Sequence, residues 1–376
     1  MVGGGQLARM TAQAAIGLGV TFRVLAASEA ESAALVTHDV AIGSHLSLPD
    51  VAAFAAGCDV VTFDHEHVPG AILTALESSG ALVRPGSAAL RFTQDKLAMR
   101  DQLTALGVPC PRYAPVSSVA DVVKFADGSW PVVLKAISGG YDGKGVWVCS
   151  SPAEAAEVIG HRIELLAEEF VPFRRELAAL VALSPSGQGA AYPVVQTVQV
   201  DGICREVIAP APGLDTELAE LAQARALRIA ASLGVVGLLA VELFETSRGL
   251  LVNELAMRPH NSGHWTIEGA RTSQFEQHLR AVLDLPLGSC SPVAPRGAVT
   301  VMANLLGGTD PDIYDRYIHV MADDPAVKVH FYGKDSRPGR KIGHVTVVGS
   351  EDEVAAVRDR ARRAASYLRW GTENGD

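Results

Sequence analysis

The sequence has few cysteines, and their spacing forms no metal or disulfide motif. Five cysteines are scattered over 376 residues, and no two form a CxxC pair: Cys58, Cys110, Cys149, Cys204 and Cys290. Zinc sites and redox dithiols use closely spaced cysteines, and small secreted domains use many of them. We therefore expect reduced thiols in a cytoplasmic protein.

Long apolar runs and an excess of basic charge are also lacking. No stretch approaches the roughly 20 apolar residues that span a bilayer, and no basic segment followed by an apolar one marks a secretory signal at the N-terminus. We expect no membrane partner. The net charge is −10, which argues against nucleic acid, because phosphate backbones select basic surfaces. A small anionic substrate stays compatible, since a site can be locally basic.

The length predicts two or three domains, because 376 residues exceed one ordinary core. The first part alternates strand-like runs with helical patterns, which predicts an open parallel α/β sheet. The expected strands are Phe22–Ala26, Val36–Ile42, Val60–Phe63 and Ala81–Val83. The turn Gly3-Gly4-Gly5-Gln6 opens the first expected helix. Such a turn can bind a phosphate, although glycines also occur there for packing, and only two residues precede it as a strand.

The remainder mixes helices with hairpins. Asp95 begins one expected helix, which ends near Gly107, and Asp215 caps another that Gly234 stops. The expected strands are Val132–Ala136, Val146–Cys149, Leu165–Glu168, Leu177–Leu183, Tyr192–Val200 and Ile203–Ile208. The last region is expected to contain the strands Ala298–Ala303, Val327–Tyr332 and Ile342–Val348, then a helix Glu351–Leu368.

The stretch from Leu238 to Trp265 is the most informative. Two apolar runs flank a turn at residues 246–249, the pattern of a β-hairpin. Glu242 would lie opposite residue 253 or 254, so Glu242 and Glu254 can share one face. Two facing carboxylates repel unless a cation lies between them, and such oxygen ligands suit Mg²⁺ bound with phosphate. The alternative is that both acids lie on a solvated hairpin face.

Several functional groups crowd into the segment after this hairpin. They surround Pro259 and Gly263, and they are Arg258, His260, Asn261, His264 and Trp265. Catalytic residues often lie on loops held by a rigid scaffold. The segment therefore predicts chemistry next to the metal acids, although a single histidine is more often structural.

A second cluster predicts nucleotide binding. The four glycines from Gly139 to Gly145, with Lys144 among them, make a loop that can fold over polyphosphate. The order is not that of a Walker P-loop, and a merely flexible hairpin is the alternative. Lys135 interrupts an apolar strand just before the loop, and a half-buried lysine needs an anionic partner. Glu168-Glu169 then lead into Phe170-Val171, whose backbone can pair with an adenine edge, and Glu176 follows as a ribose partner.

This ordered set of motifs resembles the ATP-grasp enzymes, and within them the N5-carboxyaminoimidazole ribonucleotide synthases of purine biosynthesis. The stretches that carry the resemblance cover nearly the whole chain: GGGQLARM, TQDKLAMR, GGYDGKG, NELAMRPHNSGHWT, SQFEQHLRAV and RPGRKIGH. The combination of HNSGHWT, GGYDGKG and RPGRKIGH is highly specific.

The resemblance implies an ATP-grasp fold of mixed α/β and α+β class. Its implied parts are an N-terminal Rossmann-like parallel-sheet domain (1–90), a small lid subdomain (91–180), a large catalytic subdomain (181–295) and a small C-terminal domain (296–376). The implied reaction uses ATP and Mg²⁺ to join bicarbonate to 5-aminoimidazole ribonucleotide, and the implied assembly is a homodimer.

The resemblance also implies a role for individual residues. The implied ATP contacts are Arg91, Lys135, Gly140, Tyr141, Asp142, Gly143, Lys144, Gly145, Val146, Glu168, Glu169, Phe170, Val171, Glu176, Asn253 and Glu254. Glu242 and Glu254 would hold Mg²⁺. The implied bicarbonate and catalytic residues are Arg258, His260, Asn261 and His264. One departure concerns Gln199, which stands where the family usually has histidine; it can form hydrogen bonds with the nucleotide but cannot carry a proton.

The ribonucleotide needs a basic phosphate pocket and a polar crevice. Arg337, Arg340 and Lys341 are the expected phosphate residues, with a solvated basic loop as the alternative. The other expected contacts are Gly5, Gln6, Asp64, Glu66 and Tyr141. Asp64-His65-Glu66-His67 resembles a zinc cluster, but acids at the C-terminal end of a parallel strand more typically meet a ligand.

Three other functions fit parts of the sequence. A sister ATP-grasp ligase would keep Lys135, Glu242 and Glu254 but not HNSGHW. A dinucleotide dehydrogenase would use Gly3–Gly5, yet no complete G-x-G-x-x-G with an acid ~20 residues later is present. A non-enzymatic binding module would not need paired metal acids.

Overall fold

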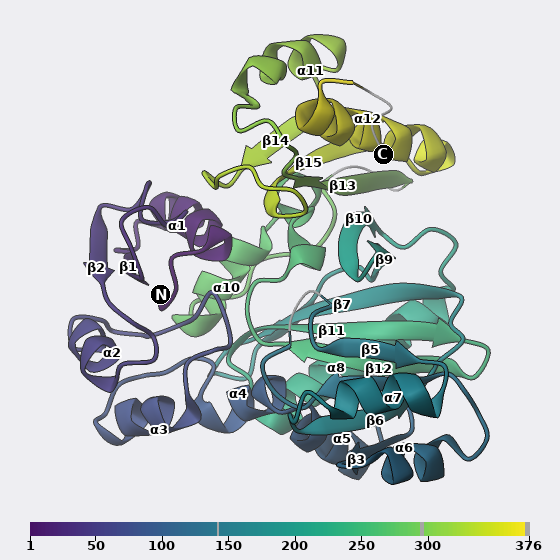
Figure 1. Ribbon diagram of the computed structural model, residues 1–376. Helices are drawn as coiled ribbons and strands as arrows, with labels where there is room; N and C mark the ends of the chain where they lie inside the picture. The colour runs from purple at the N-terminus through teal and green to yellow at the C-terminus, as the bar shows by residue number, and fades with distance from the viewer. Residues whose placement is uncertain (141–142, 294–296, 373–376) are drawn as a thin grey trace.

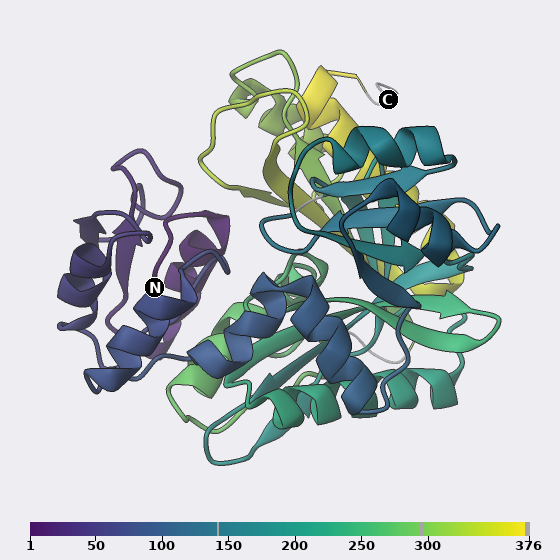
Figure 2. The ribbon, with the colours of Figure 1, turned by 60° about the horizontal axis from the view of Figure 1, so that its bottom comes forward.

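The chain forms three β-sheets in a computed structural model that describes residues 1–140, 143–293 and 297–372 (Figure 1). A small N-terminal parallel sheet, a four-stranded sheet and a nine-stranded sheet follow one another along the chain. The N-terminal part stands to one side in both views, and helix α12 (Val354–Trp370) lies on the opposite side (Figures 1 and 2). No helix in the described part of the chain is long and apolar enough to cross a membrane.

The N-terminal region is the expected parallel α/β sheet. Strands β1 (Arg23–Ala26) and β2 (Asp39–Ile42) pair in parallel, and single parallel bridges join Val2 to Leu25 and Phe63. A further parallel bridge joins residues 61 and 83, so the expected strands there are reduced to isolated bridges. The strand predicted from residue 36 begins only at residue 39. The helices are α1 (Gln6–Leu18), α2 (Leu48–Ala55), α3 (Gly70–Ser78) and α4 (Ser87–Gln94).

The four-stranded sheet is antiparallel and carries two helices. Its order is β3 (Tyr113–Val116), β6 (Leu165–Glu169), β4 (Val132–Ala136) and β5 (Val146–Cys149). Helices α6 (Val119–Ala126) and α7 (Pro152–Ile159) contribute Val122, Phe125 and Ala155 to its core. Because side chains alternate along β4, Leu134 faces this core and Lys135 faces the opposite side.

The nine-stranded sheet joins the middle of the chain to its C-terminal region. Its order is β12 (Gly249–Ala256), β11 (Gly237–Thr246), β7 (Arg175–Leu183), β9 (Val195–Val200), β10 (Ile203–Ala209), β13 (Ala298–Leu306), β15 (Lys341–Ser350) and β14 (Lys328–Phe331), and β8 (Gly189–Ala191) pairs with β7. All three C-terminal strands appear as expected from the sequence. They do not form a sheet of their own, however, because β13 pairs with β10.

The helix ends that were predicted from capping residues are confirmed. Helix α5 (Lys96–Ala105) begins after Asp95, whose carboxylate accepts from a backbone N–H. Helix α8 (Thr216–Leu233) begins after Asp215 and ends at Gly234, which has φ 67°. The remaining helices are the short η1 (Asn261–Gly263), η2 (Tyr314–Arg316) and η3 (Glu351–Glu353), and α9 (Thr266–Gly269), α10 (Gln274–Val282) and α11 (Tyr317–Asp323).

Candidate functional site

A cleft of about 910 Å³ is lined by all three sheets. The first glycine turn and residues 64–69 contribute from the N-terminal region, and Lys135 and residues 168–171 contribute from the four-stranded sheet. The β11–β12 hairpin, the loop after it and Lys341 contribute from the nine-stranded sheet. Segments that are far apart in the sequence therefore meet at one site.

The β11–β12 hairpin places two glutamates opposite each other. Glu242 pairs directly with Glu254, and a β-bulge at this point leaves Asn253 without an opposite residue. Burial, together with the nearby Glu254 and Glu176 carboxylates, raises the pKa of Glu242 to about 8. A carboxylate pair in this state favours a bound cation. The predicted arrangement of the two acids is confirmed; their metal role stays a prediction.

The lysine predicted to need an anionic partner has one. Lys135 Nζ lies 2.7 Å from Glu168 Oε2 and donates to Asn253 Oδ1 at 3.1 Å. Arg100, which is fully buried, donates from Nε to Glu168 Oε1 at 2.6 Å and also to the backbone carbonyls of Val252 and Asn253. Although burial disfavours the charged carboxylate, Lys135 and Arg100 hold the pKa of Glu168 below its ordinary value.

The glycine loop joins the four-stranded sheet to the cleft. Gly139, Gly143 and Gly145 have φ between 75° and 79°, and Gly140, Gly143 and Val146 line the cleft. A side chain at Gly143 would approach the Gly202 Cα to 3.2 Å, so the loop meets the turn of the β9–β10 hairpin. Lys144 and Gly145 are not among the lining residues. Tyr141 and Asp142, which the sequence assigns to this site, lie outside the described residues.

Outside the glycine loop, most of the residues that were predicted to contact ATP line the cleft. The lining residues include Glu168, Glu169, Phe170, Val171, Glu176, Gln199 and Asn253. Burial raises the pKa of Glu176 to about 7. Arg91 is the exception, because it is exposed, lies 4.4 Å over the Phe92 ring and is not a lining residue.

The loop after β12 brings its four predicted functional residues to the cleft. Arg258 Nε lies 3.3 Å from Glu66 Oε2, and His260 Nε2 lies 3.3 Å from Glu242 Oε1. Asn261 exchanges two hydrogen bonds with Asn304, at 3.0 and 2.7 Å.

The two histidines of this loop are neutral. Burial, with Arg258 and Lys341 nearby, keeps the pKa of His260 well below its usual value. His264 is fully buried, and burial lowers its pKa to about 3. The rings can therefore act as hydrogen-bond donors or acceptors of fixed pattern and do not supply positive charge.

The first glycine turn packs against the acids of the strand end at residue 64. Gly5 N donates to Asp64 Oδ2 at 2.5 Å, and burial raises the pKa of Asp64 to about 6. Gly3 has φ 102°, and a Cβ there would lie 1.7 Å from Asp64 Oδ1, so this position requires glycine. Gln6 accepts a hydrogen bond from Lys334. Gly5, Gln6, Asp64 and Glu66 all line the cleft.

The three basic residues that were expected to bind the substrate phosphate do not lie together at the cleft. Lys341 lines the cleft, whereas Arg337 and Arg340 are not among its lining residues. Both arginines are exposed and lie 3.4 and 4.0 Å from Asp335. The structure therefore brings one of the three predicted phosphate residues to the site.

Sequence reasoning missed two cations of helix α5. Lys96 Nζ donates to Glu254 Oε1 at 2.9 Å, and Arg100 holds Glu168. The two cations are four residues apart, so they share one helix face. The sequence signal for them is a pair of cations at helical spacing in the stretch TQDKLAMR.

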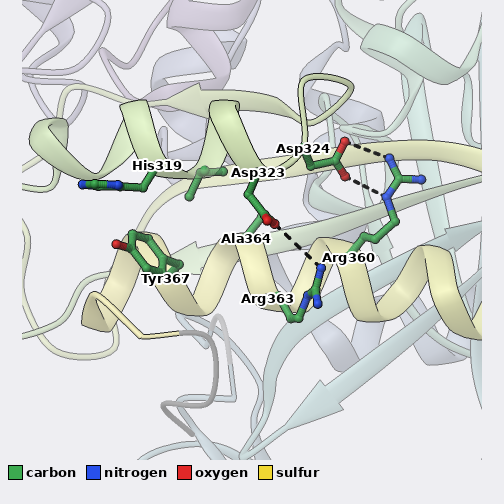
Figure 3. Close-up of a pocket in the computed structure, with 8 residues that line it drawn as sticks. His319, Asp323, Asp324, Arg360, Arg363, Ala364 and Tyr367 are labelled. Atoms are coloured by element: carbon green, nitrogen blue, oxygen red, sulfur yellow. Dashed lines mark hydrogen bonds and ion pairs between the residues drawn. The ribbon is translucent and has the colours of Figure 1, made fainter.

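A second, smaller hollow of about 170 Å³ lies between α11 and α12 (Figure 3). Asp324 forms two hydrogen bonds with Arg360, at 2.7 and 3.0 Å, and Asp323 lies 3.7 Å from Arg363. None of the predicted site residues lines this hollow.

Comparison with known proteins identifies the family. Residues 1–94 match a model described as a ribonucleotide synthetase preATP-grasp domain, and residues 101–275 match an ATP-grasp domain. Residues 300–358 match a phosphoribosylaminoimidazole carboxylase C-terminal domain. The N5-carboxyaminoimidazole ribonucleotide synthase of Mycobacterium tuberculosis is 56% identical over 380 residues, covering 99% of this chain and 87% of that protein. The chain belongs to the N5-carboxyaminoimidazole ribonucleotide synthase family.

Other members of the synthase family agree in sequence and in fold. The Corynebacterium ammoniagenes synthase is 49% identical, with 98% of this chain and 91% of that protein covered. The Thermus thermophilus synthetase structure matches with a TM-score of 0.86 and 38% identity over 98% of this chain and 99% of that one. An Aspergillus clavatus synthase, solved with ADP and 5-aminoimidazole ribonucleotide, matches with a TM-score of 0.87 and 30% identity over 98% of both chains. The resemblance and the ATP-grasp fold inferred from sequence are confirmed, and the dehydrogenase and binding-module alternatives are excluded.

Proposed function

We propose that the chain is an ATP-dependent carbon–nitrogen ligase of purine biosynthesis. It joins bicarbonate to the exocyclic amine of 5-aminoimidazole ribonucleotide, forms N5-carboxyaminoimidazole ribonucleotide and releases ADP and phosphate. The observation that supports this most strongly is that the Glu242–Glu254 pair and the Arg258–His264 loop meet in one cleft. The Aspergillus clavatus relative was solved with ADP and the ribonucleotide.

ATP would bind between the four-stranded sheet and the β11–β12 hairpin. Lys135 is a cation of this part of the cleft; Glu168 holds its ammonium, and Arg100 in turn holds Glu168. The backbone after Glu168 would meet the adenine edge, and Glu176 and Gln199 would contact the ribose and its neighbours. The glycine loop would cover the phosphates, with Lys144 and Arg91 as further predicted contacts from sequence.

The residues present fit Mg²⁺. Among the described residues no group of three or more His, Cys, Asp or Glu side chains is arranged to hold a metal, so Glu242 and Glu254 would share the ion with ATP phosphate oxygens. The raised pKa of Glu242 supports this, because a cation there would relieve the repulsion between the two carboxylates. When bound, the ion offsets charge on the transferring phosphoryl group.

Bicarbonate is a poor electrophile because its carbon carries an anionic, resonance-stabilised group. Transfer of the ATP γ-phosphoryl group to a bicarbonate oxygen forms carboxyphosphate and releases ADP. The amine of the ribonucleotide then attacks that carbon, or CO₂ freed from it in the cleft. The carbon–oxygen bond to phosphate breaks, the amine loses one proton as the carbon–nitrogen bond forms, and phosphate leaves. Arg258 would hold the bicarbonate anion, and His260, Asn261 and His264 would orient it beside the phosphates.

The ribonucleotide would occupy the side of the cleft next to the N-terminal region. The backbone around Gly5 and the Gln6 side chain would face it, with Asp64 and Glu66 beside them. Of the three basic residues expected to bind its phosphate, Lys341 is the one that lines the cleft. Arg337, Arg340 and Tyr141 stay predictions from sequence.

ADP release with Mg-ATP tests this function when bicarbonate and the ribonucleotide are added separately and then together. We expect release to depend on the ribonucleotide and to fall when bicarbonate is removed. ATP binding without any response to the ribonucleotide would instead favour another ATP-grasp ligase acting on a different nucleotide or carboxylate.

The domain boundaries, the oligomeric state and the location in the cell are proposed from the same family resemblance. We propose the four-part division 1–90, 91–180, 181–295 and 296–376, a homodimer and a location in the cytoplasm, where the five free cysteines stay reduced. Light scattering after gel filtration tests the dimer, and limited proteolysis tests the divisions.

A further inference from the structure

A single buried glutamine holds both histidines of the loop after β12. Gln274 is the first residue of α10 and is fully buried. Its Oε1 accepts from the backbone N–H of His260 at 2.8 Å, and its Nε2 donates to the carbonyl of His260 at 2.8 Å. Its Nε2 also lies 2.9 Å from Nδ1 of His264.

These contacts determine which ring nitrogen of His264 carries the proton. The backbone N–H of His260 must face the amide oxygen, so the amide nitrogen faces His264. An amide nitrogen can only donate, so His264 Nδ1 must be the unprotonated acceptor. The ring is neutral, because burial lowers its pKa. Its proton therefore lies on Nε2, which meets no hydrogen-bond partner among the residues that the structure describes.

The packing leaves the glutamine little freedom. A Cβ at Gly263 would lie 2.3 Å from Gln274 Oε1, so the loop passes directly over the amide. Thr266 Oγ1 accepts from Gln274 N at 2.8 Å and donates to the Gly263 carbonyl at 2.6 Å. The His264 ring stacks on Phe275, with its centroid 5.7 Å from the phenyl ring.

We infer that Gln274 is a positioning residue that fixes His264 as an Nε2–H donor for an anionic oxygen bound in the cleft. His264 lines that cleft, and its Nε2 is a buried polar atom that has no hydrogen-bond partner among the described residues. The inference rests on the proposed function, in which the oxygen belongs to bicarbonate or carboxyphosphate. A fixed donor of this kind stabilises negative charge without reorganisation during the reaction.

The nitrogen NMR spectrum of the unmodified protein tests the proton position directly. Histidine labelled with ¹⁵N distinguishes the Nε2–H tautomer from the Nδ1–H tautomer, and comparison with His264→Gln assigns the signals. We expect the Nε2–H form for His264 between pH 6 and 8. A signal for Nδ1–H or for a doubly protonated ring would overturn the inference, and this measurement needs no Gln274 variant to fold.

Gln274→Glu tests the positioning role with little change in shape. A carboxylate accepts where the amide donated, so it draws a proton to His264 Nδ1 and repels the His260 carbonyl. We expect kcat for ADP release to fall at least roughly 10-fold, as when a partner that orients a site histidine is lost. The KM for ATP should stay within about two-fold, because Gln274 touches no residue of the proposed nucleotide subsite.

Gln277→Glu is the matched control. Gln277 lies on the same helix, is also fully buried and exchanges hydrogen bonds of 2.8 and 2.9 Å with the backbone of Gly288. We expect it to lower the melting temperature as much as Gln274→Glu but to leave kcat and the His264 tautomer unchanged. Equal kcat values in the two variants would contradict the inference. Failure of the unmodified protein to release ADP with ribonucleotide and bicarbonate would contradict the proposed function instead, while the tautomer stays measurable.

Discussion

His260 Nε2 lies 3.3 Å from Glu242 Oε1, so the functional loop and the paired acids form one continuous site. Ser262 N donates to His260 Nδ1 at 3.3 Å, which leaves the proton of this neutral ring on Nε2, toward the carboxylate. The histidine therefore orients Glu242 without adding charge.

Glu254→Gln should abolish turnover without unfolding the protein. The amide keeps the shape of the carboxylate but removes its charge, so we expect ADP release to fall by roughly 10²-fold or more. Glu276→Gln, on a helix-surface pair with Arg280, is the control and should leave both properties unchanged. Near-normal activity of Glu254→Gln at an unchanged melting temperature would refute the metal assignment.

The pH dependence of the free energy of unfolding should reveal the raised pKa of Glu242. Its folded-state pKa of about 8 exceeds the ordinary value of 4.5, so the folded protein binds the proton more tightly than the unfolded chain does. The free energy of unfolding therefore falls as pH rises from about 5 to 8. Glu242→Gln removes this contribution, and the stability of the wild type minus that of the variant should decline over this window.

Denaturation in urea at several pH values measures that difference. Mg²⁺ with a nucleotide should flatten the decline, because a bound cation favours the charged carboxylate. Asp64, whose pKa is raised to about 6, titrates in the same window in both proteins and cancels from the comparison. Glu176, whose pKa is raised to about 7, interacts with Glu242, so the difference reports these two carboxylates together. A difference that does not vary with pH would contradict the raised Glu242 pKa.

Arg100→Met should destabilise the fold strongly. It leaves the buried Glu168 carboxylate with one cation in place of two, and breaking a buried ion pair typically costs about 3–5 kcal/mol. Urea denaturation measures the loss. Arg23→Met removes a surface ion pair with Asp39 and should cost no more than about 1 kcal/mol; equal losses in the two variants would contradict the role of Arg100.

Gly3→Ala should impair the ribonucleotide side of the cleft. The new Cβ would overlap Asp64 Oδ1 at a backbone φ of 102°, so the turn must shift and the KM for the ribonucleotide should rise. Gly17→Ala is the matched change in α1, where a Cβ meets nothing within 4 Å, and it should stabilise the helix by up to about 1 kcal/mol. An unchanged KM for the ribonucleotide in Gly3→Ala would contradict a role of this turn in substrate binding.

Lys341→Gln and Arg337→Gln should differ, although the sequence assigns both residues to one phosphate pocket. Lys341 lines the cleft, and Arg337 lies outside it beside Asp335. We expect the KM for the ribonucleotide to rise roughly 10-fold or more in Lys341→Gln, as for the loss of one charge-assisted hydrogen bond. It should change little in Arg337→Gln, and steady-state kinetics with varied ribonucleotide compares the two.

Local signals predicted much of this structure. Asp215 and Gly234 mark the two ends of α8 because capping depends on neighbouring residues alone. Counting outward from the two-residue turn places Glu242 opposite Asn253, and the register shift beyond Leu243 makes Glu254 its partner instead. The sequence left open whether residue 253 or 254 lies opposite Glu242, and the β-bulge at Asn253 decides for residue 254.

Contacts between residues far apart in the sequence could not be predicted from local patterns. The pairing of β10 with β13, which extends one sheet into the C-terminal region, joins segments about a hundred residues apart. The partners of Arg100 lie 68 and 152 residues away, and the separation of Arg337 from Lys341 depends on how their loop folds. These features follow from tertiary packing, which leaves no periodic trace in the sequence.

The formation of a labelled product tests the central claim most directly. With ¹³C-bicarbonate, Mg-ATP and 5-aminoimidazole ribonucleotide, the ¹³C NMR spectrum should show a carbamate carbon that grows in step with ADP. That result would establish carbon–nitrogen ligation at the cleft. Release of ADP with no labelled carbamate, under conditions where the product is stable, would contradict it.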